Sequence, residues 1–177
     1  MEENVNVWKA NLTNGLILGL IGIVFSLVMY FLDLSFNKVQ GYVFIIIQIV
    51  ILYFLLKSYR DNFLHGYITY GQALGAGLVI FLYYAILIAI FTYILYSVID
   101  TGLLNKQMAF NEELMLKKGK PQAQIDAGMA FQSKIMKPAI MAPLSVFGTM
   151  LGGLIISLIV GIFVRKEGNP LIDTPAN

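Results

Sequence analysis

Residues Tyr59–Val98 read YRDNFLHGYITYGQALGAGLVIFLYYAILIAIFTYILYSV, a charged turn followed by a long apolar run. Between the two parts, Thr69 and Gln72 match a capping box, in which each side chain bonds the other residue's backbone amide. From Ala73 to Val98 there is no Asp, Glu, Lys, Arg or His. A helix over residues 69–98 would be about 45 Å long, which exceeds the hydrocarbon core of a bilayer. We therefore expect it to tilt or to project beyond the lipid.

The composition of the chain predicts a single-domain membrane protein. Of its 177 residues, 58% are hydrophobic and 12% are charged, and the mean hydropathy is +0.77. Ordinary soluble domains are about 25% charged, and a soluble core of this size could not bury so much apolar surface. A net charge of +2 is too small for a nucleic-acid footprint. With no cysteine and one histidine, we expect no metal site and no other cofactor.

Apolar segments of membrane length predict four spans, at residues 10–32, 41–57, 69–98 and 138–164. A cleaved signal peptide is the alternative for the first, but Met29–Asp33 is a poor cleavage sequence. A buried strand is the alternative for Val43–Leu56, but its length and Gln48 favour a helix. We therefore expect an all-α integral membrane four-helix bundle, with a disordered tail at residues 167–177.

A polar segment at residues 100–137 separates the third span from the fourth. It carries six lysines and four acidic residues. Gly119-Lys120-Pro121 is typical of a helix end followed by a helix start, so we expect an extramembrane helical hairpin. Two interpretations stay open: the hairpin packs only on itself, or its methionine-bearing faces contact a protein partner.

Small residues spaced four apart predict where the spans pack, because helices in lipid associate through close backbone approach. The expected packing positions are Gly15, Gly19, Gly71, Gly75, Gly148, Gly152, Ser157 and Gly161. Their matched depths predict that the first, third and fourth spans form the core, with the second at its edge. The alternative is that one of these faces forms a homo-oligomer.

Chemistry-bearing residues are absent from the predicted spans. Apart from Lys57, which closes the second span, no Asp, Glu, Lys, Arg or His lies inside them, which argues against a proton-coupled transporter, a pump or a voltage sensor. Ser58, Asp61 and His65 could be proposed as a hydrolytic trio, but they lie on one short turn with no visible oxyanion hole. We interpret that turn as solvated, with Asp61 paired to Lys57, and expect no enzyme activity.

Four spans place both termini on one side of the membrane, with lipid around the spans. That side holds five basic residues, Lys9, Lys57, Arg60, Arg165 and Lys166, against seven on the other. The raw count favours termini outside the cytoplasm. However, both arginines lie on the first side and four acidic residues dilute the loop lysines, so we expect cytoplasmic termini.

The segments Tyr59–Phe63, Gly66–Leu74 and Ile155–Glu167 resemble a bacterial membrane family filed as domain of unknown function 4199. The resemblance covers nearly the whole chain and implies a four-helix integral membrane protein typical of Gram-negative envelopes. It implies no activity and no functional residues. We expect a non-enzymatic structural or accessory subunit of an envelope complex in the inner membrane. The alternative is a small transporter or lipid-handling protein, which would need a polar cavity at mid-depth.

Overall fold

Helices make up the computed structural model, which describes residues 5–167. In chain order they are α1 (Val7–Phe31), α2 (Lys38–Phe63), α3 (Tyr70–Ile94), the π-helix η1 (Leu95–Ile99), α4 (Leu103–Lys117), α5 (Gln122–Ile135) and α6 (Pro138–Val164). The predicted all-α class is confirmed, and within residues 5–167 the β-type pairing is an isolated bridge between Ile68 and Lys166. The tail predicted to be disordered lies, from residue 168 onward, outside the described residues.

Polar side chains explain where three of the spans begin. Asn6 caps α1 by accepting bonds from two backbone amides, and Asn37 caps α2 by accepting one. The predicted capping box is present at α3. The Thr69 Oγ1 accepts the amide of Gln72 at 3.3 Å, and the Gln72 Oε1 accepts the amide of Thr69 at 2.9 Å. These bonds satisfy amides that an apolar environment would leave without a partner.

The four predicted spans are confirmed as helices long and apolar enough to cross a membrane: α1, α2, α6, and α3 with η1 as one span of 30 residues. One boundary prediction is wrong, because residues 59–63 form the last turn of α2 and not a loop. Tyr59 is buried there, and the Arg60 Nη1 donates to the carbonyl oxygen of Val164 in α6 at 3.1 Å. Contacts with a distant helix therefore extend α2 beyond its apolar run.

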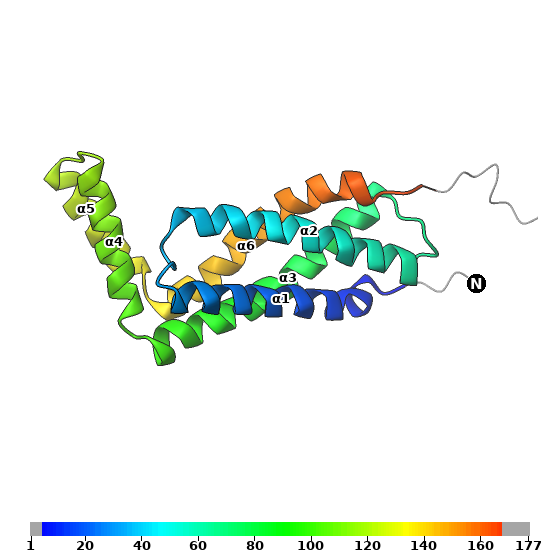
Figure 1. Ribbon diagram of the computed structural model, residues 1–177, viewed down its shortest axis with the longest axis horizontal. Coiled ribbons are helices and arrows are strands. Elements are labelled where there is room, and N and C mark those ends of the chain that lie inside the picture. The colour runs from blue at the N-terminus through cyan, green and yellow to red at the C-terminus, as the bar shows by residue number, and fades with distance from the viewer. Residues whose placement is uncertain (1–4, 168–177) are drawn as a thin grey trace, which may run out of the picture.

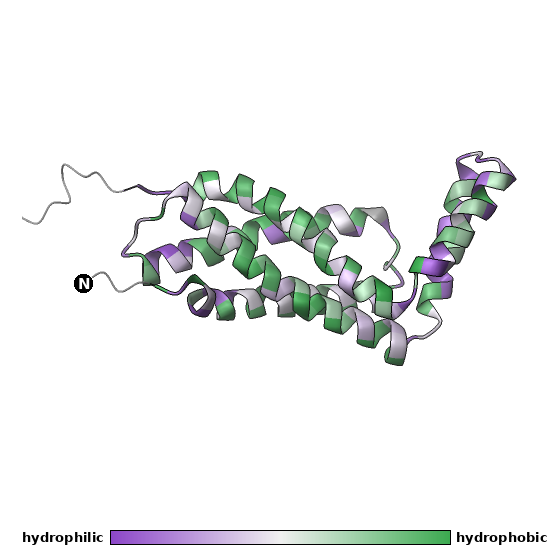
Figure 2. Cartoon of the chain, turned by 180° about the vertical axis from the view of Figure 1, so that it is seen from behind, coloured by the Kyte–Doolittle hydropathy of each residue, from purple (hydrophilic) through white to green (hydrophobic). Residues whose placement is uncertain are grey.

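The spans lie side by side in alternating directions, and α4 and α5 stand crosswise at one end of them (Figure 1). Both ends of the described chain, residues 5 and 167, lie at the opposite end of the bundle, as four spans require. The spans consist mostly of hydrophobic residues, whereas the α4–α5 pair alternates hydrophilic and hydrophobic ones (Figure 2). Phe31, Phe147 and Phe163 are 77, 70 and 71% exposed, which lipid tolerates and water does not.

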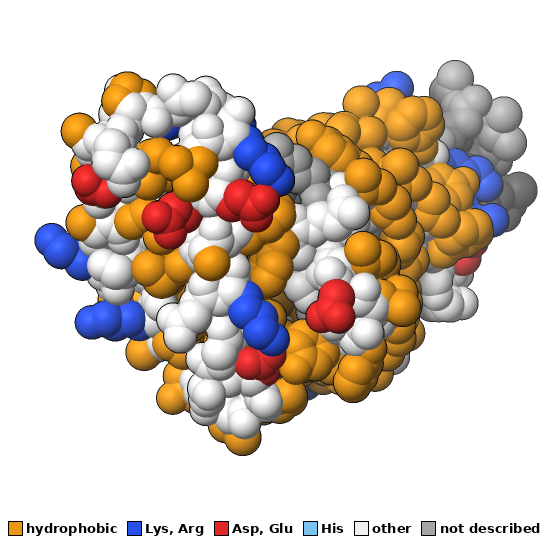
Figure 3. Space-filling model, turned by 60° about the vertical axis from the view of Figure 1, so that its left-hand side comes forward, with side chains coloured by type: hydrophobic (Ala, Val, Ile, Leu, Met, Phe, Trp, Pro, Cys, Tyr) orange, Lys and Arg blue, Asp and Glu red, His pale blue; other side chains and the backbone are white. Residues whose placement is uncertain are grey.

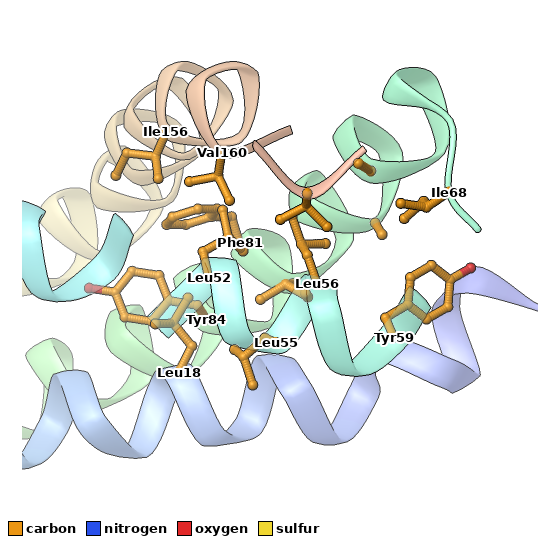
Figure 4. Close-up of a cluster of buried hydrophobic side chains, with 14 residues drawn as sticks. Leu18, Leu52, Leu55, Leu56, Tyr59, Ile68, Phe81, Tyr84, Ile156 and Val160 are labelled. Carbon is orange, nitrogen blue, oxygen red and sulfur yellow. The ribbon is translucent and has the colours of Figure 1, made fainter. Parts of the chain in front are cut away.

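Side chains from all four spans meet in one core (Figure 4). Leu18 of α1, Leu52 and Leu56 of α2, Phe81 of α3 and Val160 of α6 are essentially inaccessible. α3 lies between α1 and α6 and makes the closest backbone contacts with both. The second span lies at the edge of the tight α1–α3–α6 packing, as expected, and makes fewer close backbone contacts. Its large leucines nevertheless reach into the core.

The contact between α1 and α3 uses the glycines that the sequence predicted. A Cβ added at Gly15 would overlap Tyr83, and one at Gly19 would overlap Leu87. Glycine at these positions lets the two backbones approach, which is how helices gain packing energy in lipid.

The contact between α3 and α6 includes two of the expected positions. Ser157 is fully buried beside Gly77, and Gly161 lies against the ring of Tyr70, where an added Cβ would be 3.2 Å from the ring. Gly153, four residues before Ser157 in the same row of small residues, lies against Phe81, so a Cβ there would overlap that side chain.

The other expected packing positions make no contact with a neighbouring helix of this chain: Gly71, Gly75, Gly148 and Gly152. A Cβ added at any of them would meet no atom within 4 Å. Residues two apart on a helix point about 200° away from each other. Because Gly77 faces the neighbouring helix, Gly75 lies on a different face of α3. Each helix has several rows of small residues, and spacing alone does not select the inward one.

Candidate functional site

The helical hairpin α4–α5 is the part of the molecule that departs most from a simple bundle. Its two helices pack through buried Ile125 and through the Met115 methyl group, which lies against Gly128. The Asn111 Nδ2 donates to the Gln132 Oε1 at 3.1 Å, which ties the helices together with a polar bond. The two helices therefore pack on each other.

Asp100 anchors the start of this hairpin to the bundle. Its carboxylate accepts bonds from the Lys106 Nζ at 3.2 Å, the Tyr30 hydroxyl at 3.2 Å and the Gly102 amide at 3.0 Å. These bonds favour the ionised form, and the Lys106 bond foremost holds the pKa of Asp100 below its ordinary value. The same pair raises the pKa of Lys106. One carboxylate thus joins α1, the end of η1 and the first turns of α4.

A cavity of about 430 Å³ lies beside this anchor, between the α1–α2 connection and α4. Its walls include Asp33, Lys106, Phe110 and Glu113. Across the same junction, Phe36 stacks on Phe110 with ring centroids 5.7 Å apart. An aromatic contact and an ionic contact together fix how the hairpin leaves the bundle.

The surface of the hairpin mixes charged and apolar side chains, in contrast to the almost wholly apolar bundle beside it (Figure 3). Leu116 is 53% and Phe131 is 63% exposed. The exposed lysines of the hairpin and its flank are Lys106, Lys117, Lys118, Lys120, Lys134 and Lys137. Lys117 is paired with Glu113 at 2.6 Å.

The hydrolytic trio considered from the sequence does not form a hydrogen-bonded chain. Asp61 bonds the Arg60 Nε at 2.8 Å, so its ion pair is with Arg60 and not with Lys57. The Ser58 Oγ accepts a bond from Asn62 at 3.0 Å. His65 is exposed at a turn, with φ of 53°. Among residues 5–167, no group of three or more His, Asp and Glu side chains is arranged to hold a metal ion.

The sequence missed two buried polar side chains at the start of α1. The Asn11 Nδ2 donates to the Val7 carbonyl at 3.0 Å, and the Asn14 Nδ2 donates to the Asn11 Oδ1 at 3.0 Å. Their spacing of three places them on one helix face, which is the signal that could have identified them. They satisfy each other within α1.

At mid-depth the interior is filled with large side chains. Phe81 and Leu52 are inaccessible, and Tyr84 of α3 and Gln48 of α2 are buried. Pockets of about 340 and 450 Å³ flank the spans, and both are lined almost entirely by apolar residues. These residues do not form the polar cavity that a transporter of neutral solutes needs.

Comparison with known proteins places the chain by family. No curated protein and no solved structure matches it. The family described as "Protein of unknown function (DUF4199)" matches residues 13–166, which include most of the first span, the other three spans and the hairpin. The resemblance in the α2–α3 connection and at the end of α6 therefore reflects descent, and the chain belongs to the DUF4199 family.

Proposed function

We propose that the protein is a non-enzymatic accessory subunit of an envelope complex in the bacterial inner membrane, with the α4–α5 hairpin as its contact with a partner. The observation that carries the proposal is the hairpin itself. It stands crosswise at the end of the bundle and is attached through Asp100 and the Phe36–Phe110 stack (Figure 1). Its remaining surface is available to another molecule.

The charge of the hairpin indicates the kind of partner. Residues 100–137 include six lysines and four acidic residues. One of these acids, Asp100, forms an ion pair with Lys106. Lys118 and Lys120 are exposed at the tip. We infer an acidic extramembrane surface of another envelope protein, with Leu116 and Phe131 as apolar anchors.

The alternative of a transporter or lipid-handling protein is supported less well. A transported polar solute needs a polar path, whereas the mid-depth interior is occupied by Phe81, Leu52 and Tyr84. The apolar pockets beside the spans are compatible with ordinary lipid contact. A packed interior fits a structural subunit.

The orientation proposed with this function has the termini in the cytoplasm and the hairpin on the other side. Arg60 and Arg165 lie at the end of the bundle that carries the termini, together with Lys57 and Lys166. Arginine and lysine at short flanks favour the cytoplasmic face.

The test is site-specific photo-crosslinking in living cells. A benzophenone amino acid is placed at Phe131 on the hairpin, and at Phe147 on the outside of α6 as the control, since both side chains are well exposed. We expect a discrete crosslinked protein at Phe131 and none at Phe147. Charge reversal of Lys118 and Lys120 to Glu should abolish it, because the acidic partner would be repelled.

Two outcomes contradict the proposal. One is the absence of any protein crosslink at Phe131 or Leu116 in cells where the protein is inserted in the membrane. The other is a crosslink only to a second copy of this chain, which would make the hairpin a homo-oligomer contact.

A further inference from the structure

A second cavity lies at the opposite end of the bundle from the hairpin, and the proposed function does not use it. It measures about 770 Å³ and is bounded by the first residues of α1, the end of α2, the start of α3 and the segment after α6. Buried Tyr59 and Ile68 and the small Ala76 form apolar parts of its wall. Two backbone bonds between Ile68 and Lys166, of 2.8 and 2.9 Å, hold that wall in place.

The rim of this cavity is polar. His65, Thr69, Gln72, Lys166 and Glu167 contribute to it. An apolar wall with a few polar groups at one side, in a volume of several hundred cubic ångströms, is the composition of a small-molecule site.

Gly75 opens the cavity on the side of α3. It lines the cavity, and a Cβ there would meet no atom within 4 Å. Its small size therefore does not serve a helix contact, and it leaves space in the cavity wall. Gly71, one turn earlier on the same helix, is equally open but does not line the cavity.

Lys166 is the lysine that lines the cavity, and Glu167 is the carboxylate beside it. The Lys166 Nζ lies 5.4 Å from the centre of the Tyr67 ring, which also lines the cavity. Lys57, Arg60 and Lys166 all attract the Asp61 carboxylate, so these side chains lie at the same end of the bundle, with Lys57, Arg60 and Asp61 outside the cavity wall. With Glu167, this cluster holds three cations and two carboxylates, and Lys166 is the cation that reaches the cavity.

We propose that this cavity binds one molecule of an anionic phospholipid. The headgroup phosphate would lie at the rim near Lys166, and an acyl chain would lie along Val7, Tyr59 and Ala76. The cavity lies at the end of the bundle away from the hairpin, where the apolar spans meet their charged ends, the depth at which a lipid headgroup is found. Basic pockets between membrane helices recognise anionic headgroups by this combination of charge and apolar wall.

The experiment is native mass spectrometry of the full-length protein, purified in mild detergent and delipidated. It is titrated with phosphatidylglycerol, with phosphatidylethanolamine and with inorganic phosphate. We expect one saturable phosphatidylglycerol, with about tenfold weaker binding of phosphatidylethanolamine. Inorganic phosphate should not displace the lipid, because it lacks the apolar part.

Three variants locate the site. Gly75→Phe fills the cavity and should weaken phosphatidylglycerol binding by about tenfold or more, while Gly71→Phe, its matched control, should bind like the wild type. Lys166→Gln should remove the preference for the anionic lipid. Circular dichroism and thermal unfolding check that each variant is folded.

The proposal is overturned if the wild type shows no saturable lipid, or if Gly75→Phe binds as tightly as Gly71→Phe. Equal binding of the two lipids by the wild type would also overturn it. If Gly75→Phe fails to fold, an unchanged preference of Lys166→Gln for phosphatidylglycerol would overturn the proposal instead. None of these results bears on the hairpin, so this proposal and the proposed function fail separately.

Discussion

Gly148 and Gly153 of α6 differ in how much an added methyl group should change the stability of the bundle. Gly153 lies against Phe81 and has no room for a Cβ, whereas Gly148 has nothing within 4 Å. Both lie in the same apolar helix, so the same substitution at Gly148 is a matched control for the substitution at Gly153.

Gly153→Ala should destabilise the protein by about 1–3 kcal/mol, because the new methyl group must displace Phe81 from the core. Gly148→Ala should cost nothing, because alanine is the better helix former and the methyl group enters lipid. Unfolding by SDS in mixed micelles, followed by circular dichroism, measures both. Equal losses in the two variants would mean that α6 does not present the Gly153 face to α3.

Asp100 makes the hairpin anchor dependent on pH. Its pKa is lowered in the folded state below the ordinary 3.8, so the stability that it contributes is present above that value and is lost as the pH falls through the lower, folded-state pKa. The pKa of Lys106 is raised above 10.5, so its contribution is present below that value and is lost as the pH rises through the higher, folded-state pKa.

The hairpin should therefore be held firmly at neutral pH and loosen in strong acid. Spin labels on cysteines introduced at Lys57 and Ser133 report the distance between bundle and hairpin, and the chain has no cysteine of its own. The distance distribution should broaden below the folded pKa of Asp100. Asp100→Asn should broaden it at neutral pH, and an unchanged distribution would show that other contacts hold the hairpin.

At the scale of the element, the start of α3 depends on a local bond that the sequence already specifies. The capping box of Thr69 and Gln72 satisfies amides at an end that borders the apolar interior. Thr69→Ala should lower stability by about 1 kcal/mol, whereas Thr69→Ser keeps the hydroxyl and should restore most of it. The same SDS titration measures the effect, with Thr13→Ala on the exposed side of α1 as control. A loss in Thr69→Ser as large as in Thr69→Ala would point to the methyl group and not to the cap.

At the scale of the molecule, the hairpin and the termini lie at opposite ends of the bundle (Figure 1). A cysteine at Ser133 in α5 and one at Ser58 in α2 should therefore react from opposite sides of the membrane, since both side chains are exposed. With cytoplasmic termini, an impermeant thiol reagent added to intact cells should label Ser133→Cys and spare Ser58→Cys. The reverse pattern would invert the orientation but keep the fold, while labelling of both would exclude four spans.

The sequence alone determined the four spans, the pair of helices between the third and fourth, and the cap at Thr69. These features are local, because they depend on the length of an apolar run, on Gly119 before Pro121, or on two side chains three residues apart. The membrane class followed from the same property, since 58% hydrophobic residues cannot be buried in a small soluble domain.

Only the tertiary structure decided which small residues face inward. Gly77 and Gly153 pack while Gly75 and Gly148 do not, because the choice depends on where Ser157 and Phe81 of the facing helices project. The tertiary structure also decided where α2 ends, because Arg60 bonds Val164, which is 104 residues away in the sequence. It likewise formed the cavity beside Gly75, whose wall comes from several helices. Spacing along one helix defines its rows of small residues, but the shape of the neighbouring helices selects among them.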